Sequence, residues 1–194
     1  MKKKRIFIAI NLPEIIKNKL VEYQKEIDES FFEENFHPIR WTKKENLHIT
    51  LEFLGYLTEE EILKVKEVLK NLVKNFSPFE VNLIEVRYGP KEEKIPRMIW
   101  VVGERKKEIL DLKEKLDDKL KKSINFEPEK REFTPHITLG RIRKWQFKAI
   151  PLDERPKVKK EIDLNLKVNS IELMESILKR TGPDYKIIES FLLH

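Results

Sequence analysis

The chain contains no cysteine, which excludes disulfide bonds and thiolate metal sites and is typical of a reducing compartment. No apolar run approaches the roughly 20 residues that a membrane-spanning helix needs. The basic N-terminus precedes a short apolar run, Ile6 to Leu12, but no small-residue cleavage site follows, so the segment does not fit a secretory signal peptide. We therefore expect a soluble, cytoplasmic protein that makes no membrane contact.

The short motifs of several large enzyme classes are also missing. The chain has no Gly-x-Ser-x-Gly elbow, no Walker loop, no Gly-x-Gly-x-x-Gly loop and no His-x-His-x-His motif of nucleotide hydrolases. Neither of the two histidine motifs described below carries a second metal ligand at the expected offset. We therefore expect chemistry that uses no metal ion and no cofactor.

Charged residues make up 38% of the chain, and 40 Lys and Arg against 34 Asp and Glu give a net charge of +6. Richness in Lys and Glu resembles the composition of thermophile proteins, which form ion-pair networks on their surfaces. The positive excess favours polyanions such as RNA, but a solvated thermophilic surface explains it equally well. A length of 194 residues fits one domain, or two small lobes that share one core.

The tetrapeptide His48-Ile49-Thr50-Leu51 returns unchanged as His136-Ile137-Thr138-Leu139. Side chains alternate between the two faces of a strand, so each His and its Thr should project together while Ile and Leu face the core. Only four histidines occur in the chain, and half of them lie in this pattern. The repeat therefore indicates two related strands that each present an imidazole and a hydroxyl.

A similar succession of elements precedes both copies. In the first half, Ile6 to Ile10 is apolar on both faces, as in a central strand. Asn11, as N-cap, and Pro13 predict the start of a helix that ends near Ser30. A loop then leads to the first His-x-Thr strand, from Leu47 to about Leu57.

After a candidate linker, Gly89 to Pro96, the succession restarts with a strand at Met98 to Val102 and a helix at Glu104 to Lys122. Corresponding strands and histidines are offset by 93 and 88 residues, which indicates a duplication. We therefore predict an α+β fold with one bilobal domain, whose halves span about 1–90 and 97–194. Pseudo-twofold symmetry would place mainly antiparallel sheets around a central cleft, with helices outside.

Three local features complete the prediction. Thr58 and Glu61 form a capping box that opens a second helix in the first half. The copies diverge after the second motif, where Arg141 to Lys160 reads as a basic loop. The apolar alternation of Leu164 to Val168 changes parity beyond Asn169-Ser170, which predicts a bulge there.

Two imidazoles and two hydroxyls at one centre suit in-line displacement at phosphorus, because the attacking and leaving oxygens lie on opposite sides of the phosphorus atom. One histidine can act as the base and the other as the acid, since the unperturbed pKa of histidine is about 6.5. The Thr hydroxyls can donate hydrogen bonds to the non-bridging oxygens. The two motifs are too symmetric to show which histidine has which role.

The duplicated His-x-Thr-Leu strands resemble the two-histidine (2H) phosphoesterase superfamily. The sequences around them are similar to the RNA 2',3'-cyclic phosphodiesterase branch of that superfamily, historically named 2'-5' RNA ligase. The similarity extends across nearly the whole chain. The similar segments are Arg40-Trp41, Glu45 to Gly55, Pro96 to Trp100 and Phe133 to Arg141.

The resemblance implies metal-independent hydrolysis of a terminal 2',3'-cyclic phosphate of RNA to a 2'-phosphomonoester. It implies that His48 is the general acid and His136 the base, and that Thr50 and Thr138 bind the phosphate. The RNA could derive from tRNA, and we expect a monomer. The alternatives are reversible 2'-5' joining of RNA ends and a non-catalytic module that binds RNA ends.

Arg141 matches an arginine that the family places near the phosphate. Five residues separate it from His136, so on an ideal strand it points away, and it reaches the site only if Gly140 ends or bulges the strand. Aromatic residues near the motifs are candidates for stacking on an unpaired base or for the core. For RNA binding we single out Trp145, within the basic segment, together with Phe53 and Trp41.

Overall fold

The computed structural model describes residues 3–31, 37–90, 95–180 and 182–194. It contains one sheet of nine strands in which every pairing is antiparallel. The strands are β1 (Lys4–Asn11), β2 (Ile39–Trp41), β3 (His48–Leu57), β4 (Phe79–Gly89), β5 (Met98–Gly103), β6 (His136–Ile142), β7 (Lys159–Val168), β8 (Ser170–Lys179) and β9 (Gly182–Leu192). The helices are α1 (Glu14–Glu29), α2 (Glu59–Val73), α3 (Lys107–Ser123), α4 (Lys144–Ala149) and a 3-10 turn, η1 (Lys44–Asn46).

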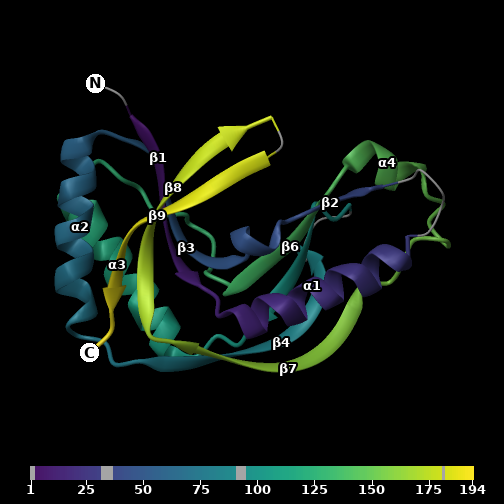
Figure 1. Ribbon diagram of the computed structural model, residues 1–194, viewed down its shortest axis with the longest axis horizontal. Helices are drawn as coiled ribbons and strands as arrows, with labels where there is room; N and C mark the ends of the chain where they lie inside the picture. Colours follow the sequence, from purple (N-terminus) through teal and green to yellow (C-terminus); the bar gives the residue numbers. More distant parts are fainter. Residues whose placement is uncertain (1–2, 32–36, 91–94, 181) are drawn as a thin grey trace.

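The order of the strands is symmetric about the sheet centre. The order is β7-β4-β5-β6-β3-β1-β8-β9, with β2 paired to the end of β6, so the two His-x-Thr strands β6 and β3 are central neighbours. Figure 1 shows α2 and α3 at one end of the molecule and α4 at the other, with the β8–β9 hairpin projecting from the body. The predicted α+β class with antiparallel pairing is confirmed.

The two faces of β1 are buried in different clusters. Ile6, Ile8 and Ile10 of β1 join the large core formed with α1, α2 and α3, whereas Phe7 and Ala9 form a small cluster with Met174. This alternation follows from the two-residue period of a strand. It confirms that β1 is covered from two sides and leaves the face of Phe7 to border the cleft described below.

The helices bury apolar side chains that recur every three or four residues. The residues are Ile16, Leu20 and Tyr23 in α1, Ile62, Val65, Leu69 and Leu72 in α2, and Ile109, Leu112, Leu116 and Leu120 in α3. The capping box is also present, because the backbone N–H of Glu61 donates to Thr58 Oγ1 and its carboxylate accepts from the backbone N–H of Thr58. No helix in the described ranges is long and apolar enough to span a membrane.

Three local expectations were wrong. Asn11 does not cap α1, because it is the last residue of β1 and its side chain accepts from the N–H of Leu12 at 3.0 Å, while Pro13 is the N-cap. The segment 141–160 is not entirely a loop, since α4 lies within it. The parity change at Asn169-Ser170 is no bulge but the passage from β7, which pairs with β4, to β8, which pairs with β1.

The segment Gly89 to Pro96 connects two neighbouring strands of the sheet. Its residues 91–94 lie outside the described residues, and the strands on either side, β4 and β5, pair with each other from Leu83↔Gly103 to Gly89↔Met98. We call the strands on either side of the central β6–β3 pair the two wings of the sheet. The wing beyond β6 includes β4, whereas the wing beyond β3 includes β8 and β9. The wings of the sheet therefore do not coincide with the sequence halves 1–90 and 97–194, and that division stays a prediction.

We expect Thr58→Ala to lower the free energy of unfolding by about 1 kcal/mol, because the N-cap hydroxyl satisfies an otherwise unpaired N–H of α2. Chemical denaturation monitored by circular dichroism measures the difference. Thr58→Ser keeps the hydroxyl and should retain the parent stability; equal losses in both variants would contradict the capping role.

Candidate active site

His48 and His136 begin the two central strands and lie on the same face of the sheet. The pairing of Ile49 with Ile137 fixes the register of β3 and β6. In an antiparallel ladder of this register, His48 lies across from Thr138 and Thr50 across from His136. The two histidines are therefore diagonal neighbours, for which the spacing is roughly 7–8 Å. Ile49 and Ile137 are fully buried in the core beneath them.

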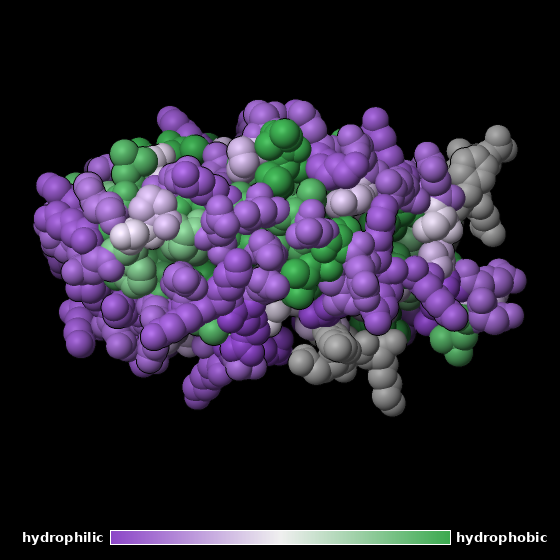
Figure 2. All heavy atoms as spheres, turned by 90° about the horizontal axis from the view of Figure 1, so that it is seen from below, coloured by the Kyte–Doolittle hydropathy of each residue, from purple (hydrophilic) through white to green (hydrophobic). Residues whose placement is uncertain are grey.

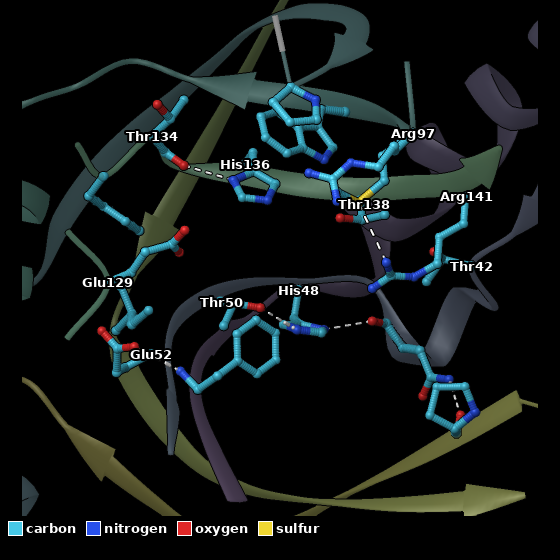
Figure 3. A pocket seen from close by; sticks show the side chains of 18 of the residues that line it. Thr42, His48, Thr50, Glu52, Arg97, Glu129, Thr134, His136, Thr138 and Arg141 are labelled. Atoms are coloured by element: carbon cyan, nitrogen blue, oxygen red, sulfur yellow. Dashed lines mark hydrogen bonds between the residues drawn. The ribbon is translucent and has the colours of Figure 1, made fainter. Parts of the chain in front are cut away.

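Both histidines line one cleft of about 900 Å³. Figure 3 shows His48 and His136 facing each other across it, with Arg97 and Arg141 toward one end and Glu52 and Glu129 toward the other. Other residues that line the cleft are Arg40, Trp41, Lys43, Thr50, Phe53, Arg87, Trp100, Lys113, Thr138 and Tyr185. The cleft thus has room for a nucleotide and a cationic end that suits its phosphate.

The backbone orients both imidazoles in the same way. His48 Nδ1 lies 2.7 Å from the carbonyl oxygen of Asn46, and His136 Nδ1 lies 2.8 Å from that of Thr134. Because a carbonyl oxygen only accepts, each Nδ1 carries a hydrogen and donates it. In the neutral ring the Nε2 atom is then the proton acceptor, and Nε2 of His48 is 2.9 Å from the hydroxyl of Thr50.

Burial lowers the pKa of both histidines. Desolvation brings the pKa of His48 to about 4, although the bond to the Asn46 carbonyl acts in the opposite direction and the neighbouring His136 contributes to the lowering. Desolvation also lowers the pKa of His136, against the bond to Thr134. Both rings are therefore neutral near pH 7 in the free protein, and a bound anion would favour protonation of one of them.

Different aromatic rings pack against the two histidines. The imidazole of His136 stacks on Trp100 with the ring centroids 3.9 Å apart and an angle of 26°. The His48 ring instead makes a T-shaped contact with Tyr185, with the centroids 5.2 Å apart, and lies 5.1 Å from a tilted Phe7 ring. These contacts hold each ring in place, and they make the two sites chemically unequal.

Arg141 reaches the cleft because β6 contains a bulge. The register of β5 and β6 passes from Ile99↔Gly140 to Trp100↔Thr138, which leaves Leu139 as an extra residue in β6. The extra residue reverses the side-chain parity, so Arg141 points to the side of His136 and lines the cleft. The condition that the strand bulges near Gly140 is thus met.

The first copy has the same irregularity. The register of β1 and β3 passes from Ile8↔Glu52 to Ala9↔Thr50, which leaves Leu51 as the extra residue. Phe53, at the offset of Arg141, accordingly lines the cleft, is 57% exposed and packs near Phe7 with a centroid distance of 5.9 Å. The two copies therefore present an aromatic ring and a guanidinium at matching positions.

The other two aromatic candidates differ in position. Trp41 lines the cleft, and its indole Nε1 donates to Asp28 at 2.8 Å. Trp145 does not line the cleft; it lies on α4 and is 73% exposed. The structure thus brings together seven of the eight predicted site residues and leaves out Trp145.

Several cleft residues were not singled out from the sequence as site residues. Trp100 ends the segment Pro96 to Trp100 that resembles the family, but it was not named as a site residue, and Tyr185 lies far from both motifs in the chain. The buried pair of Glu52 and Lys113, which also contacts Asp117, borders the cleft next to β3. Regular alternation does not identify Glu52, because the extra residue Leu51 interrupts the two-residue period between Thr50 and Glu52. Among the described residues, no group of three or more His, Cys, Asp or Glu is arranged to hold a metal ion.

Comparison with known proteins identifies the family. The model of the family described as LigT like Phosphoesterase matches twice, at residues 10–100 and 101–185. The chain belongs to the LigT-like phosphoesterase family. Its duplication is thus seen in the sequence comparison as well as in the strand order.

Curated proteins match over nearly the full length of the chain. A Methanocaldococcus jannaschii protein named RNA 2',3'-cyclic phosphodiesterase is 32% identical, covering 96% of this chain and 99% of its own. A Thermotoga maritima protein of the same name is 31% identical, covering 95% and 92%. The relatives come from thermophiles, in agreement with the composition.

Several solved structures have the same fold. The crystal structure of TT0787 from Thermus thermophilus has a TM-score of 0.80 at 29% identity, with 97% of each chain covered. Escherichia coli LigT complexed with 3'-AMP has a TM-score of 0.76 at 22% identity, with 98% of each chain covered. These similarities confirm the predicted relation to the 2H superfamily.

The histidine environments predict a distinctive pH titration. We expect NMR titration to give midpoints below 6.5 for both His48 and His136, with His48 near 4, since burial disfavours their charged forms. His48→Gln and His136→Gln assign the resonances. Added inorganic phosphate should raise at least one midpoint. A His48 midpoint at or above 6.5 would show that its ring is hydrated.

The same shift predicts how stability depends on pH. Because the folded pKa of His48 lies below the unfolded value, the unfolded chain binds more protons between pH 6.5 and about 4, and the free energy of unfolding falls as pH is lowered through this range. Denaturation at several pH values should give a shallower fall for His48→Gln than for the parent. Parallel curves would contradict the shift.

Proposed function

We propose that the protein hydrolyses the 2',3'-cyclic phosphate at the end of RNA to a 2'-phosphomonoester, without a metal ion. The observation that carries this proposal is the pair of Nδ1-anchored histidines on one face of β3 and β6, each directing Nε2 into a cleft lined by arginines. Relatives of about 30% identity over nearly the full chain bear the name RNA 2',3'-cyclic phosphodiesterase, which supports the choice of substrate.

In the proposed reaction His136 is the base. Its neutral Nε2 accepts a proton from water while the water oxygen forms a bond to phosphorus, opposite the 3'-oxygen. The bond between phosphorus and the 3'-oxygen breaks, and that oxygen receives a proton from Nε2 of His48. The products are a 2'-phosphomonoester and a 3'-hydroxyl, and proton exchange with solvent restores both histidines.

The proposal requires His48 to be protonated when substrate is bound, although burial lowers its pKa to about 4 in the free protein. The phosphate anion supplies the compensating charge, because a negative neighbour favours the imidazolium. Protonated His48 is then a strong acid toward the leaving oxygen. Burial also lowers the pKa of His136, so its ring is neutral before the reaction and can accept the proton of water.

Around the phosphorus atom, Thr50 and Thr138 would donate hydrogen bonds to the non-bridging oxygens, and Arg141 would balance their charge. Phe53 and Trp41 would contact the terminal base. We further propose that the protein acts as a monomer in the cytoplasm, where RNA ends such as those of cleaved tRNA are available. The absence of cysteine supports that compartment.

Either His48→Ala or His136→Ala should lower kcat for a cyclic-phosphate dinucleotide by about 100-fold or more, since each removes a proton-transfer group. Phosphorus NMR of the parent product should show a 2'-phosphomonoester, and EDTA should leave the rate unchanged. Inhibition by EDTA, or a His136→Ala variant as fast as the parent, would overturn the mechanism.

The same assay separates the alternatives. A non-catalytic end-binding module would bind the cyclic phosphate and leave the ring intact. A ligase would require a 5'-hydroxyl RNA as the attacking group, and adding that RNA should yield a 2'-5' linkage in the phosphorus spectrum.

A further inference from the structure

The positive charge of the protein is concentrated in one short segment. Residues 141–160 contain eight Lys and Arg against two Asp and Glu, a net charge of +6. The whole chain also has a net charge of +6, so the other 174 residues are neutral in sum. A thermophilic surface with interspersed charges does not explain an excess confined to about one tenth of the chain.

Helix α4 presents part of this charge in an ordered way. Phe147 is 2% exposed and anchors the helix through contacts with Phe31 and Tyr88, and Gln146 is also buried. At 100° per residue, Lys144, Lys148 and Trp145 span one arc of 100° on the opposite side. All three are exposed. An outward face with two cations and an indole is therefore built on a fixed base.

This face continues from the cationic end of the cleft. Arg141 lines the cleft and pairs in register with Arg40, which lines it too. Two residues later the backbone N–H of Arg143 donates to the carbonyl of Pro38 at 2.7 Å, and α4 begins at the next residue. Trp145 is four residues beyond Arg141, so at most roughly 14 Å of chain separates them. Figure 1 shows α4 adjoining β2 and β6 at the end of the molecule away from α2.

We propose that Arg143, Lys144, Trp145 and Lys148 bind the single-stranded RNA that precedes the terminal nucleotide. We call these four residues the α4 platform. The proposal rests on the proposed function, because it assumes that the cyclic phosphate occupies the cleft. The cations would contact backbone phosphates, and Trp145 would stack on an unpaired base. A single strand fits this combination, since its bases are free to stack.

The test compares two substrates, a cyclic-phosphate dinucleotide and a single-stranded decanucleotide with the same end. Trp145→Ala should raise KM for the decanucleotide roughly 5-fold or more, with kcat unchanged, because base stacking on an aromatic ring is lost. The double variant K144E/K148E should raise the same KM and reduce the slope of log KM against log salt concentration by about 1.4, or about 0.7 per phosphate contact. Both variants should process the dinucleotide like the parent.

Matched controls lie at the opposite end of the molecule. Lys70 and Lys74 have the same four-residue spacing as Lys144 and Lys148 and are exposed at the end of α2, so K70E/K74E makes the same charge change away from the platform. Leu63→Ala removes another exposed apolar side chain, 64% exposed on α2. Neither control should change KM for either substrate.

The outcomes distinguish the two proposals. If the parent opens the dinucleotide ring but the platform variants process the decanucleotide like the parent, the platform is wrong and the function stands. Equal losses on both substrates would instead show that α4 supports the fold of the cleft, which also overturns the platform. If the parent leaves the dinucleotide intact, the proposed function itself fails.

Discussion

The antiparallel pairing of β3 with β6 is the constraint on which the site depends. One paired position, Ile49 with Ile137, fixes the register of the two strands at the sheet centre. Since a strand alternates its side chains, this register alone sets two imidazoles and two hydroxyls on one face in a diagonal arrangement. A slip by one residue would turn all four into the core and bring the isoleucines to the surface. Burial of the apolar face therefore enforces the position of the polar one.

The same strands depart from regular geometry directly after the motifs. Leu51 and Leu139 are extra residues opposite β1 and β5, and each reverses the parity of the residues that follow. Gly140 adjoins the second bulge, and a β-carbon there would lie 2.6 Å from Ile39 and 2.9 Å from Trp41. The close approach of β2 thus requires glycine at that position. The bulge gives the cleft a guanidinium that regular alternation would direct away from it.

The local order of the chain was largely predictable from its sequence, whereas the long-range arrangement was not. The repeated tetrapeptide predicts the face shared by the histidines and threonines, because this signal lies within one strand. The passage from β7 to β8 looks like a bulge in the sequence, since the apolar alternation continues across it with a change of parity. The two strands are distinguished only by their partners, because β7 pairs with β4 and β8 pairs with β1. Trp100 reaches the site from β5, the neighbour of β6, and Tyr185 reaches it from the β8–β9 hairpin, so both depend on long-range pairing. Figure 2 shows a mainly hydrophilic face with smaller hydrophobic patches, which accords with the high charge content of the sequence. Composition alone does not indicate which strands pair.

The symmetric motifs do not show which histidine would be the acid and which the base, and the aromatic rings packed against the two histidines bear on this assignment. The face of an aromatic ring attracts a cation, so the stack of Trp100 on His136 at 3.9 Å favours the protonated form of that ring. His48 instead meets Tyr185 in a T-shaped arrangement with the ring centroids 5.2 Å apart and Phe7 at a tilt of 39°, and neither of these two contacts is a parallel stack. A base must hold a proton after the attack, and an acid must release one, so the indole supports His136 as the acceptor. In the proposed reaction, the direction of proton transfer would then depend on Trp100, which lies outside both motifs, because the motifs themselves supply the same two side chains.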